Sequence, residues 1–233
     1  MRLDQYLATC TGLSRKEAKK AIIGRRVQVS GELCRSANTP VAEATLVELD
    51  GSVLSLPNEI YLMMNKPEGV ISATTDSNQP TAVDLLPTDM ASKVHIAGRL
   101  DKDTTGLLLL TSDGKWSHQV TSPRRDCPKT YQVQLAEPLS SDARKQLENG
   151  VLLKGENKPT RPAIVVNCSE TKIELTIHEG RYHQVKRMLA AVGNHVEGLH
   201  RVRVGAITLD PILEPGQYRE LTEEEVRSIL NPV

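Results

Sequence analysis

Aromatic residues are scarce in this sequence, and cysteines are few. Its 233 residues include no Phe, one Trp and five Tyr, so the core must be aliphatic and an aromatic side chain in a functional site stands out. The four cysteines, at positions 10, 34, 127 and 168, lack the CxxC spacing and the paired histidines of zinc sites. We therefore expect reduced cysteines and no metal site.

Long apolar runs are missing as well. No stretch approaches the ~20 apolar residues of a membrane-spanning helix, and Asp4 and Gln5 interrupt any apolar segment of a signal peptide. A cytoplasmic protein without membrane association is therefore expected. Apolar residues still make up 39 % of the chain, which is enough for a folded core and too much for a disordered chain.

The sequence also lacks net charge, but its charges are unevenly distributed. Residues 1–36 carry eight basic side chains against three acidic ones, whereas residues 214–233 carry five Glu against two Arg. For nucleic-acid binding, the location of charge matters more than its sum. The basic N-terminal region is therefore a candidate RNA-binding surface despite the neutral total.

Local patterns predict a small N-terminal unit. Ser14 and Glu17 form the S-x-x-E capping box that begins a helix, and Gly24 ends that helix. Residues 27–33 alternate between apolar and polar and turn at a Ser-Gly pair, which predicts a hairpin. The apolar stripe of the helix is expected to comprise Ala18, Ile22 and Ile23.

A linker and a change of pattern follow. Residues 51–59, with Pro57, indicate a linker, so we divide the chain into domains at 1–56 and 60–233. Because strands outnumber helices in the second domain without strict alternation, we expect an α+β fold with a mixed, mainly antiparallel sheet flanked by helices. The predicted strands cover 60–64, 106–111, 129–135, 172–177 and 196–204, and the predicted helices cover 183–192 and 223–230.

One acidic turn stands out directly before a predicted buried strand. The segment Gly98–Gly114 reads G-R-L-D-K-D-T-T-G-L-L-L-L-T-S-D-G. Asp101 either caps the turn, as Asp before Thr and Gly usually does, or is a nucleophile that Arg99 holds ionised. The D-x-D-x-T spacing also resembles haloacid-dehalogenase phosphatases, but the βαβ alternation of their sheet is not predicted here. Asp113 and Gly114 predict a hairpin turn.

Longer motifs decide between these interpretations. The N-terminal patterns R-L-D, S-R-x-x-A-x-x-x-I and G-x-x-V-x-V-x-G resemble an S4 RNA-binding domain. The string G-R-L-D-x-x-T-x-G-L-L-L-L-T-x-D-G resembles a motif of the RsuA family of pseudouridine synthases. The same resemblance extends to Asn65–Gly69, Lys129–Val133 and Glu179–Met188.

The resemblance implies isomerisation of a uridine in RNA, without metal or organic cofactor. The reaction breaks the N1–C1′ bond, turns the uracil and joins C5 to C1′. By resemblance, Asp101 is the catalytic carboxylate and Lys186 pairs with it and orients it. Tyr131 is expected to stack on the target uracil, and Arg99 to help eject the uridine from its helix. Attack of Asp101 on C1′ and initial removal of a sugar proton both remain open.

Basic side chains supply the predicted RNA contacts, together with one hydroxyl. These RNA-binding residues are Arg2, Ser14, Arg15, Lys16, Lys19, Lys20, Arg25, Arg26, Lys129, Arg181 and Arg187. Further candidates for phosphate contacts are Arg124, Arg125, Arg201 and Arg203. Two other conspicuous residues are given structural roles: Trp116 is expected to pack in the core and Asp103 to shape the turn.

Similarity within the family favours one RNA substrate. Residues 116–118 and 121–124 are most similar to members that modify the 16S rRNA of the small ribosomal subunit. The expected partner is therefore 16S rRNA in a partly assembled small subunit, bound by a monomer. Two alternatives stay open: modification of 23S rRNA by a large-subunit paralogue, and a non-catalytic RNA-binding factor in ribosome assembly.

Overall fold

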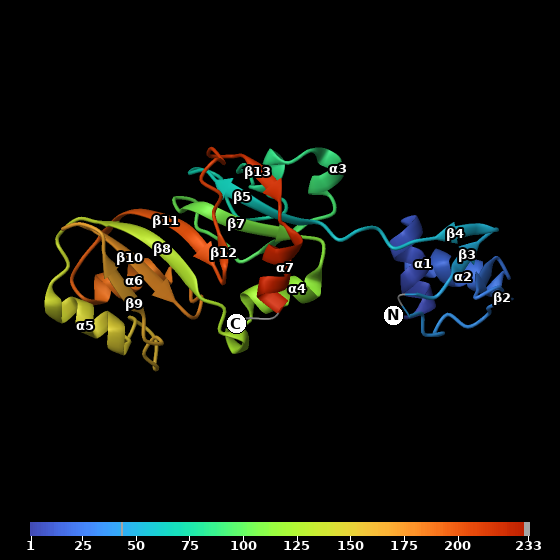
Figure 1. Cartoon of the computed structure of the whole chain (residues 1–233), viewed down its shortest axis with the longest axis horizontal. Helices are drawn as coiled ribbons and strands as arrows, with labels where there is room; N and C mark the ends of the chain where they lie inside the picture. Colours follow the sequence, from blue (N-terminus) through green and yellow to red (C-terminus); the bar gives the residue numbers. More distant parts are fainter. Residues whose placement is uncertain (43, 231–233) are drawn as a thin grey trace. The chain divides into compact units, whose positions relative to one another are not determined.

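The computed structural model describes residues 1–42 and 44–230, and the chain divides into two compact units, Met1–Asn58 and Glu59–Val233 (Figure 1). The first, called the N-terminal unit below, packs two helices against a small sheet. The second, called the catalytic unit, is built on a large mixed sheet. No helix in the described part of the chain has the length and apolar character needed to cross a membrane.

The N-terminal unit contains a four-stranded antiparallel sheet in the order β2-β1-β3-β4. Its elements are α1 (Leu3–Thr11), α2 (Arg15–Ile23), β1 (Val27–Val29), β2 (Glu32–Leu33), β3 (Val47–Leu49) and β4 (Ser52–Leu54). The predicted hairpin is confirmed, because β1 pairs with β2 across the Ser-Gly turn. The predicted linker was too long, because β4 lies within it and pairs with β3.

The capping box of α2 is confirmed. The Ser14 hydroxyl accepts a hydrogen bond from the Glu17 amide at 3.3 Å, and the Glu17 carboxylate accepts one from the Ser14 amide at 2.9 Å. Ala18 and Ile22 are fully buried as predicted, but Ile23 is 68 % exposed. A helix turns about 100° per residue, so Ile23 lies beside the stripe rather than on it.

A buried ion pair ties the start of α1 to α2. The Asp4 carboxylate is fully buried and accepts hydrogen bonds from Arg2 Nε at 3.1 Å and Arg15 Nη2 at 2.9 Å. Burial alone would raise the pKa of Asp4, but the hydrogen bonds from Arg15 and Arg2 outweigh it and lower the pKa. Both arginines are therefore occupied within the unit, although about half of each side chain is exposed.

The catalytic unit is built on a nine-stranded sheet in the order β13-β5-β7-β11-β8-β10-β9, with β12 beside β11 and β6 beside β7. The strands are β5 (Tyr61–Lys66), β6 (His95–Ala97), β7 (Thr105–Thr111), β8 (Lys129–Leu135), β9 (Ile164–Asn167), β10 (Lys172–Ile177), β11 (Val196–Val204), β12 (Ile207–Thr208) and β13 (Tyr218–Glu220). All described pairs are antiparallel except β7 with β11. This confirms the mixed, mainly antiparallel sheet and contradicts a phosphatase-like parallel one.

Helices cover both faces of this sheet (Figure 1). They are α3 (Thr88–Ala91), α4 (Gly114–Thr121), α5 (Ser141–Asn149), α6 (Gln184–Ala191) and α7 (Glu223–Leu230), with 3₁₀ turns at Val83–Leu85 and Pro123–Arg125. The four leucines of β7 are buried on both faces of the sheet. Leu108 and Leu110 belong to one core cluster with Met188 of α6, whereas Leu107 and Leu109 belong to another with Trp116 of α4. Both faces are therefore buried, as the uninterrupted leucine run requires.

The segment after β7 corrects one prediction. Asp113 and Gly114 do not form a hairpin turn, because Asp113 caps α4 and accepts hydrogen bonds from the amides of Lys115 at 2.8 Å and Trp116 at 3.1 Å. Asp is among the preferred helix-capping residues. Trp116 is fully buried and donates to the Val226 carbonyl at 3.0 Å, which confirms its packing role.

Gly106 marks the closest approach between two strands. It lies opposite Arg201 in the parallel β7–β11 pair, with φ of +99°. A Cβ at this position would lie 2.4 Å from the Arg201 carbonyl oxygen. Only glycine fits there, because a side chain would meet backbone and would also strain the left-handed conformation.

We predict that Asp4→Asn loosens the N-terminal unit. Removing the charge leaves two arginines facing a buried neutral amide, so amide hydrogens of α1 should exchange on the order of tenfold faster, or more, at neutral pH. Because the pKa of folded Asp4 is lowered, its stabilisation is present above the ordinary carboxyl pKa of about 4 and disappears as acid protonates the folded group. The difference between wild type and variant should therefore shrink in acid.

Hydrogen–deuterium exchange of the full chain measures this effect. Asp50→Asn is the matched control, because it breaks an exposed ion pair with Arg26 in the same unit. Equal exchange of α1 in wild type and Asp4→Asn would show that the buried pair contributes nothing.

Candidate active site

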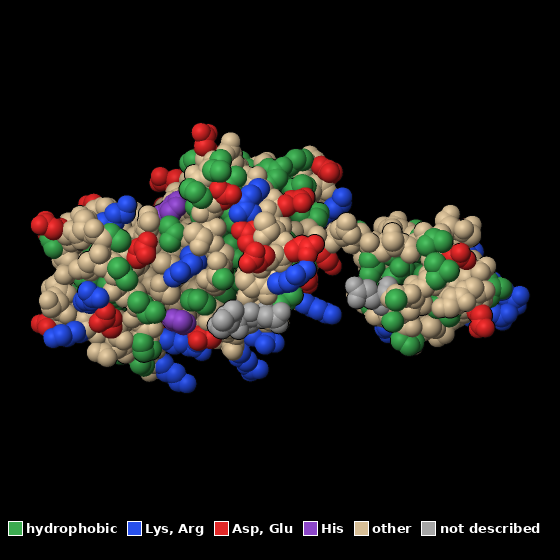
Figure 2. Space-filling model, viewed as in Figure 1, with side chains coloured by type: hydrophobic (Ala, Val, Ile, Leu, Met, Phe, Trp, Pro, Cys, Tyr) green, Lys and Arg blue, Asp and Glu red, His purple; other side chains and the backbone are tan. Residues whose placement is uncertain are grey.

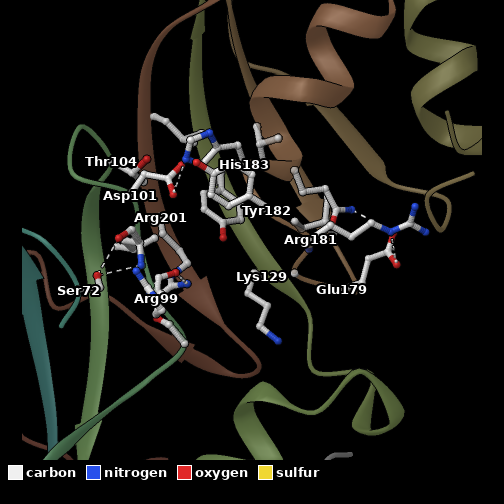
Figure 3. Close-up of a pocket in the computed structure, with 18 of the residues that line it drawn as sticks. Ser72, Arg99, Asp101, Thr104, Lys129, Glu179, Arg181, Tyr182, His183 and Arg201 are labelled. Atoms are coloured by element: carbon white, nitrogen blue, oxygen red, sulfur yellow. Dashed lines mark hydrogen bonds and ion pairs between the residues drawn. The ribbon is translucent and has the colours of Figure 1, made fainter. Parts of the chain in front are cut away.

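A cavity of about 720 Å³ opens in the catalytic unit. Its lining includes the turn 98–104 before β7, the first residues of β8, the segment 177–186 that links β10 to α6, and Leu199 and Arg201 of β11 (Figure 3). The turn and the linking segment are far apart in the sequence. The pairing register brings them together: Gly106 lies opposite Arg201, Arg201 opposite Tyr131, and Tyr131 opposite Leu175, two residues before the linking segment begins.

Asp101 lies on the wall of this cavity between two nitrogen donors. Its Oδ1 is 3.4 Å from Nε2 of His183, and its Oδ2 is 3.4 Å from Nζ of Lys186. The side chain is one-third exposed, so a bound molecule can reach it. The Lys186 partnership implied by the resemblance is present, whereas sequence reasoning missed His183.

Arg99 does not take the role that its position in the sequence suggested. Among the described residues it forms no ion pair with Asp101, so the prediction that Arg99 holds Asp101 ionised is wrong. Its side chain is exposed and lines the same cavity. Lys186 of α6 supplies the cation beside Asp101 instead.

Lys186 is shared between two carboxylates. Its ammonium lies 2.5 Å from Oδ1 of Asp103, closer than the 3.4 Å that separates it from Asp101. The hydrogen bond from Lys186 lowers the pKa of Asp103. Asp103 was expected only to shape the turn, but it also competes with Asp101 for the lysine. The D-x-D spacing was the available signal, because it places both carboxylates on one turn.

A buried lysine fixes the C-terminal end of the turn that bears Asp101. The Lys66 ammonium donates to the carbonyls of Thr104 at 2.8 Å, Pro67 at 2.9 Å and Lys102 at 3.3 Å, and its side chain is fully buried. Burial lowers the pKa of Lys66 to about 8. The N-K-P-E-G motif drew attention to this position, but the sequence gave no indication of what the lysine binds.

A buried arginine holds the other end of the turn. Arg201 is 2 % exposed and donates to the carbonyls of Leu107 at 2.8 Å and Gly98 at 2.9 Å. Its predicted contact with an RNA phosphate is therefore wrong, because its donors bind backbone inside the unit. Ser72 adds a third support, donating to the Leu100 carbonyl at 2.8 Å and accepting from the Leu100 amide at 2.9 Å.

Tyr131 lies in the middle of the sheet and on the cavity wall. It is 9 % exposed, belongs to the main core cluster and lies opposite Leu175 of β10 and Arg201 of β11. The ring is thus fixed by packing while it borders the cavity. Its stacking on a uracil stays a prediction. Nearby, the Thr104 hydroxyl is buried on the cavity wall without a hydrogen-bond partner among the described residues.

The segment before α6 has an unusual conformation. His183 adopts a left-handed conformation, with φ of 47° and ψ of 37°, directly before the helix. The Tyr182 ring stacks on the His183 ring with centroids 3.8 Å apart and planes 20° apart. Gln184 fixes the segment by donating to Glu179 at 3.1 Å and accepting from the Arg181 amide at 2.8 Å.

Several predicted RNA contacts are engaged inside the catalytic unit. The Lys129 ammonium donates to the carbonyls of Cys127 at 2.7 Å and Val120 at 2.8 Å, and burial lowers the pKa of Lys129. Arg181 and Arg187 both pair with Glu156, at 2.5 Å and 2.7 Å. Contact of these three side chains with RNA stays a prediction, and it would require these internal pairs to open or to be shared.

The predicted RNA-binding residues of the N-terminal unit differ in whether their side chains already have partners within the unit. Ser14 serves its helix cap, and Arg26 pairs with Asp50 at 2.5 Å. Five basic side chains are exposed and make no ion pair among the described residues: Lys16, Lys19, Lys20, Arg25 and Arg35. Figure 2 also shows Lys and Arg side chains projecting along one edge of the catalytic unit. RNA binding by either surface stays a prediction.

No group of three His, Cys, Asp or Glu side chains in the described part of the chain is arranged to hold a metal ion. The charges of the cavity come instead from carboxylates, lysines, arginines and histidines. This set suits an anionic, polar ligand whose chemistry proceeds by nucleophilic or acid–base steps.

Comparison with known proteins agrees with this geometry. Residues 60–191 match the family of RNA pseudouridylate synthases, and residues 1–58 match the S4 domain. The chain is 50 % identical to the ribosomal small subunit pseudouridine synthase A of Vibrio cholerae, over 98 % of this chain and 99 % of the relative. It is 49 % identical to the Escherichia coli protein of the same name, over 99 % and 100 %.

A solved structure extends this agreement to three dimensions. A crystal structure of a pseudouridylate synthase is similar with a TM-score of 0.72 and 43 % identity, over 98 % of this chain and 99 % of that one. The resemblance that the motifs indicated is thereby confirmed.

We predict that Lys66 makes stability depend on pH in the alkaline range. Folded Lys66 loses its proton near pH 8, whereas an unfolded lysine keeps it up to about pH 10.4, so the unfolded state binds more protons between these values. The stability of the wild type should therefore rise, relative to Lys66→Met, by about 3 kcal/mol as pH increases across this range.

Urea unfolding at several pH values from 7 to 10 measures the difference. Lys102→Met is the control, because Lys102 lies exposed on the same turn. A gap between wild type and Lys66→Met that stays constant with pH would contradict titration of Lys66 in this range.

Proposed function

The chain belongs to the RNA pseudouridylate synthase family, and from this premise we propose that it isomerises one uridine of 16S rRNA in a partly assembled small ribosomal subunit. The chain matches nearly the full length of relatives named small subunit pseudouridine synthase A, at 48–50 % identity. That similarity favours small-subunit RNA over a large-subunit substrate. We also propose that the enzyme acts as a cytoplasmic monomer.

The arrangement around Asp101 is the observation that carries the proposal. A carboxylate that must act on the sugar needs to be ionised, accessible and held in one place. Lys186 and His183 each place a nitrogen 3.4 Å from it, and the turn that bears it is bound through its carbonyls by Lys66 and Arg201. Such preorganisation lowers the reorganisation required when charge develops in the reaction.

The first steps of the isomerisation each have a candidate side chain. The Asp101 carboxylate faces the sugar and either forms a bond to C1′ as the N1–C1′ bond breaks or first removes a sugar proton. The detached uracil stays against Tyr131 while it turns to present C5 to C1′. As C5 bonds to C1′, the Asp101–C1′ bond breaks or, on the other route, the sugar regains its proton. C5 then loses a proton and N1 gains one, so the net reaction is an isomerisation. Because a base in a helix cannot reach this cavity, the uridine must be flipped out.

Release of tritium from uracil C5 tests the proposal. The substrates are 16S and 23S rRNA labelled at C5, each free and in ribosomal particles, with wild type and Asp101→Asn. We expect release from 16S rRNA, strongest in immature small-subunit particles, and none above background with the variant. Asn keeps the shape of Asp but supplies neither a nucleophile nor a base.

The other outcomes point to the alternatives. Release from 23S rRNA alone would keep the chemistry and reject the small-subunit substrate. Tight RNA binding without release from any substrate would favour a non-catalytic role in assembly. Circular dichroism of Asp101→Asn checks that its fold is retained.

The shared lysine yields a second prediction. Lys186→Met removes the positive charge beside Asp101, so single-turnover conversion should slow roughly 100-fold. Lys186→Arg should retain most activity, because a guanidinium can span both carboxylates. Asp103→Asn removes the competing partner and should leave the rate within about threefold of wild type.

Rapid-quench measurement with saturating enzyme separates the chemical step from RNA binding. A rate for Lys186→Met close to wild type would contradict the role of this charge. A loss in Asp103→Asn as large as that in Lys186→Met would show that Asp103 does more than compete for the lysine.

A further inference from the structure

Tyr182 is the one strongly exposed aromatic side chain in the described part of the catalytic unit. It is 77 % exposed, whereas Trp116 and Tyr131 are buried and the remaining two tyrosines, Tyr61 and Tyr218, are partly buried. No step of the proposed isomerisation uses Tyr182. A large ring left in water, in a chain with few aromatics, indicates a surface that another molecule covers.

Its location restricts what that molecule can be. Tyr182 lines the cavity that contains Asp101, and Figure 3 shows its ring between Asp101 on one side and Arg181 and Glu179 on the other. One face of the ring is covered by His183, at a centroid distance of 3.8 Å, and the large exposure leaves its other face open. The same His183 approaches Asp101 at 3.4 Å, so the tyrosine is one ring away from the catalytic carboxylate.

On the premise of the proposed function, we propose that the open face of Tyr182 is a second nucleobase subsite. It takes an unpaired base adjacent in the RNA strand to the uridine on which Asp101 acts. A flat aromatic face binds any nucleobase by stacking, and unpaired bases are the ones free to stack in this way. Tyr131 remains the surface for the uracil itself, because it is buried inside the cavity.

The charges around the subsite suit the connecting backbone. Arg99 is exposed, lines the same cavity and forms no ion pair among the described residues. A phosphate between the flipped uridine and its neighbour therefore meets an available guanidinium. Arg181 and Arg187, in contrast, already pair with Glu156, and Arg181 also pairs with Glu179.

The platform is also held in place before RNA arrives. Arg187 donates to the Tyr182 carbonyl at 3.1 Å, and the left-handed conformation of His183 directs the two adjacent rings against each other. A preformed platform loses little conformational entropy when a base stacks on it. Stacking on Tyr182 also restrains His183, so occupation of the subsite steadies a partner of Asp101.

Substitution of Tyr182 with matched RNAs tests the subsite. We use Tyr182→Ala and Tyr182→Phe, with Ile212→Ala as the control because Ile212 is 83 % exposed and lies outside the cavity lining. The RNA is a 16S fragment spanning the modified uridine, either complete or with an abasic nucleotide on its 5′ or 3′ side. For the complete RNA, KM should rise about 10- to 100-fold in Tyr182→Ala and stay unchanged in Tyr182→Phe and the control.

The abasic RNAs distinguish stacking from a structural effect. When the base that occupies the subsite is missing, wild type and Tyr182→Ala should have the same KM. A KM increase of equal size on complete and abasic RNAs, or no KM increase on complete RNA, would overturn the subsite. A change in kcat alone, equal across all RNAs, would also overturn it.

A binding measurement keeps the subsite separate from the proposed reaction. 2-Aminopurine replaces each neighbouring base in turn, and its fluorescence should be quenched on binding to wild type and Tyr182→Phe but much less on binding to Tyr182→Ala. Equal quenching in all three proteins would reject the subsite. Absence of tritium release with wild type would instead reject the proposed function, while the fluorescence still decides whether a base stacks on Tyr182.

Discussion

The active cavity depends on positive charges buried against backbone carbonyls. Residues 98–104, the turn that bears Asp101, belong to no helix and to no strand. Lys66 binds the carbonyls at its far end, and Arg201 binds those at its near end and at the start of β7. Each cation satisfies several buried acceptors at once, which offsets the cost of burying a charge. The carboxylate can then stay exposed while its backbone is fixed.

Sequence motifs and hydrophobic periodicity predicted much of this architecture. The strands β8, β10 and β11 begin and end where the sequence predicted them, with β8 and β10 marked by alternation of apolar and polar residues. The resemblance placed Asp101 and Lys186 together, and the structure has them 3.4 Å apart. The short strands β3, β4, β6, β9, β12 and β13 were not predicted, because so few residues carry too little of a pattern.

Other parts of the site could not be read from the sequence, because they depend on contacts between distant segments. Sequence proximity suggested that Arg99 pairs with Asp101, but Asp101 lies instead beside Lys186 of α6 and beside His183, the residue directly before that helix. An arginine that binds carbonyls, such as Arg201, looks in the sequence like one that binds phosphate. Its burial, at 2 % exposed, decides between the two.

The parallel pairing of β7 with β11 also determines which part of the chain can fold first during synthesis. Only Thr105 and Gly106 pair with β11, and their partners His200 and Arg201 lie about a hundred residues later in the chain. While the C-terminal strands are still inside the ribosome, the Asp101 turn lacks Arg201 and the cavity lacks the part of its lining that β11 supplies. The hydrophobic core and the four-stranded sheet of the N-terminal unit are built from residues within the first 58, so this unit can fold long before. A growing chain is therefore able to form its S4-like unit before it has a working catalytic centre.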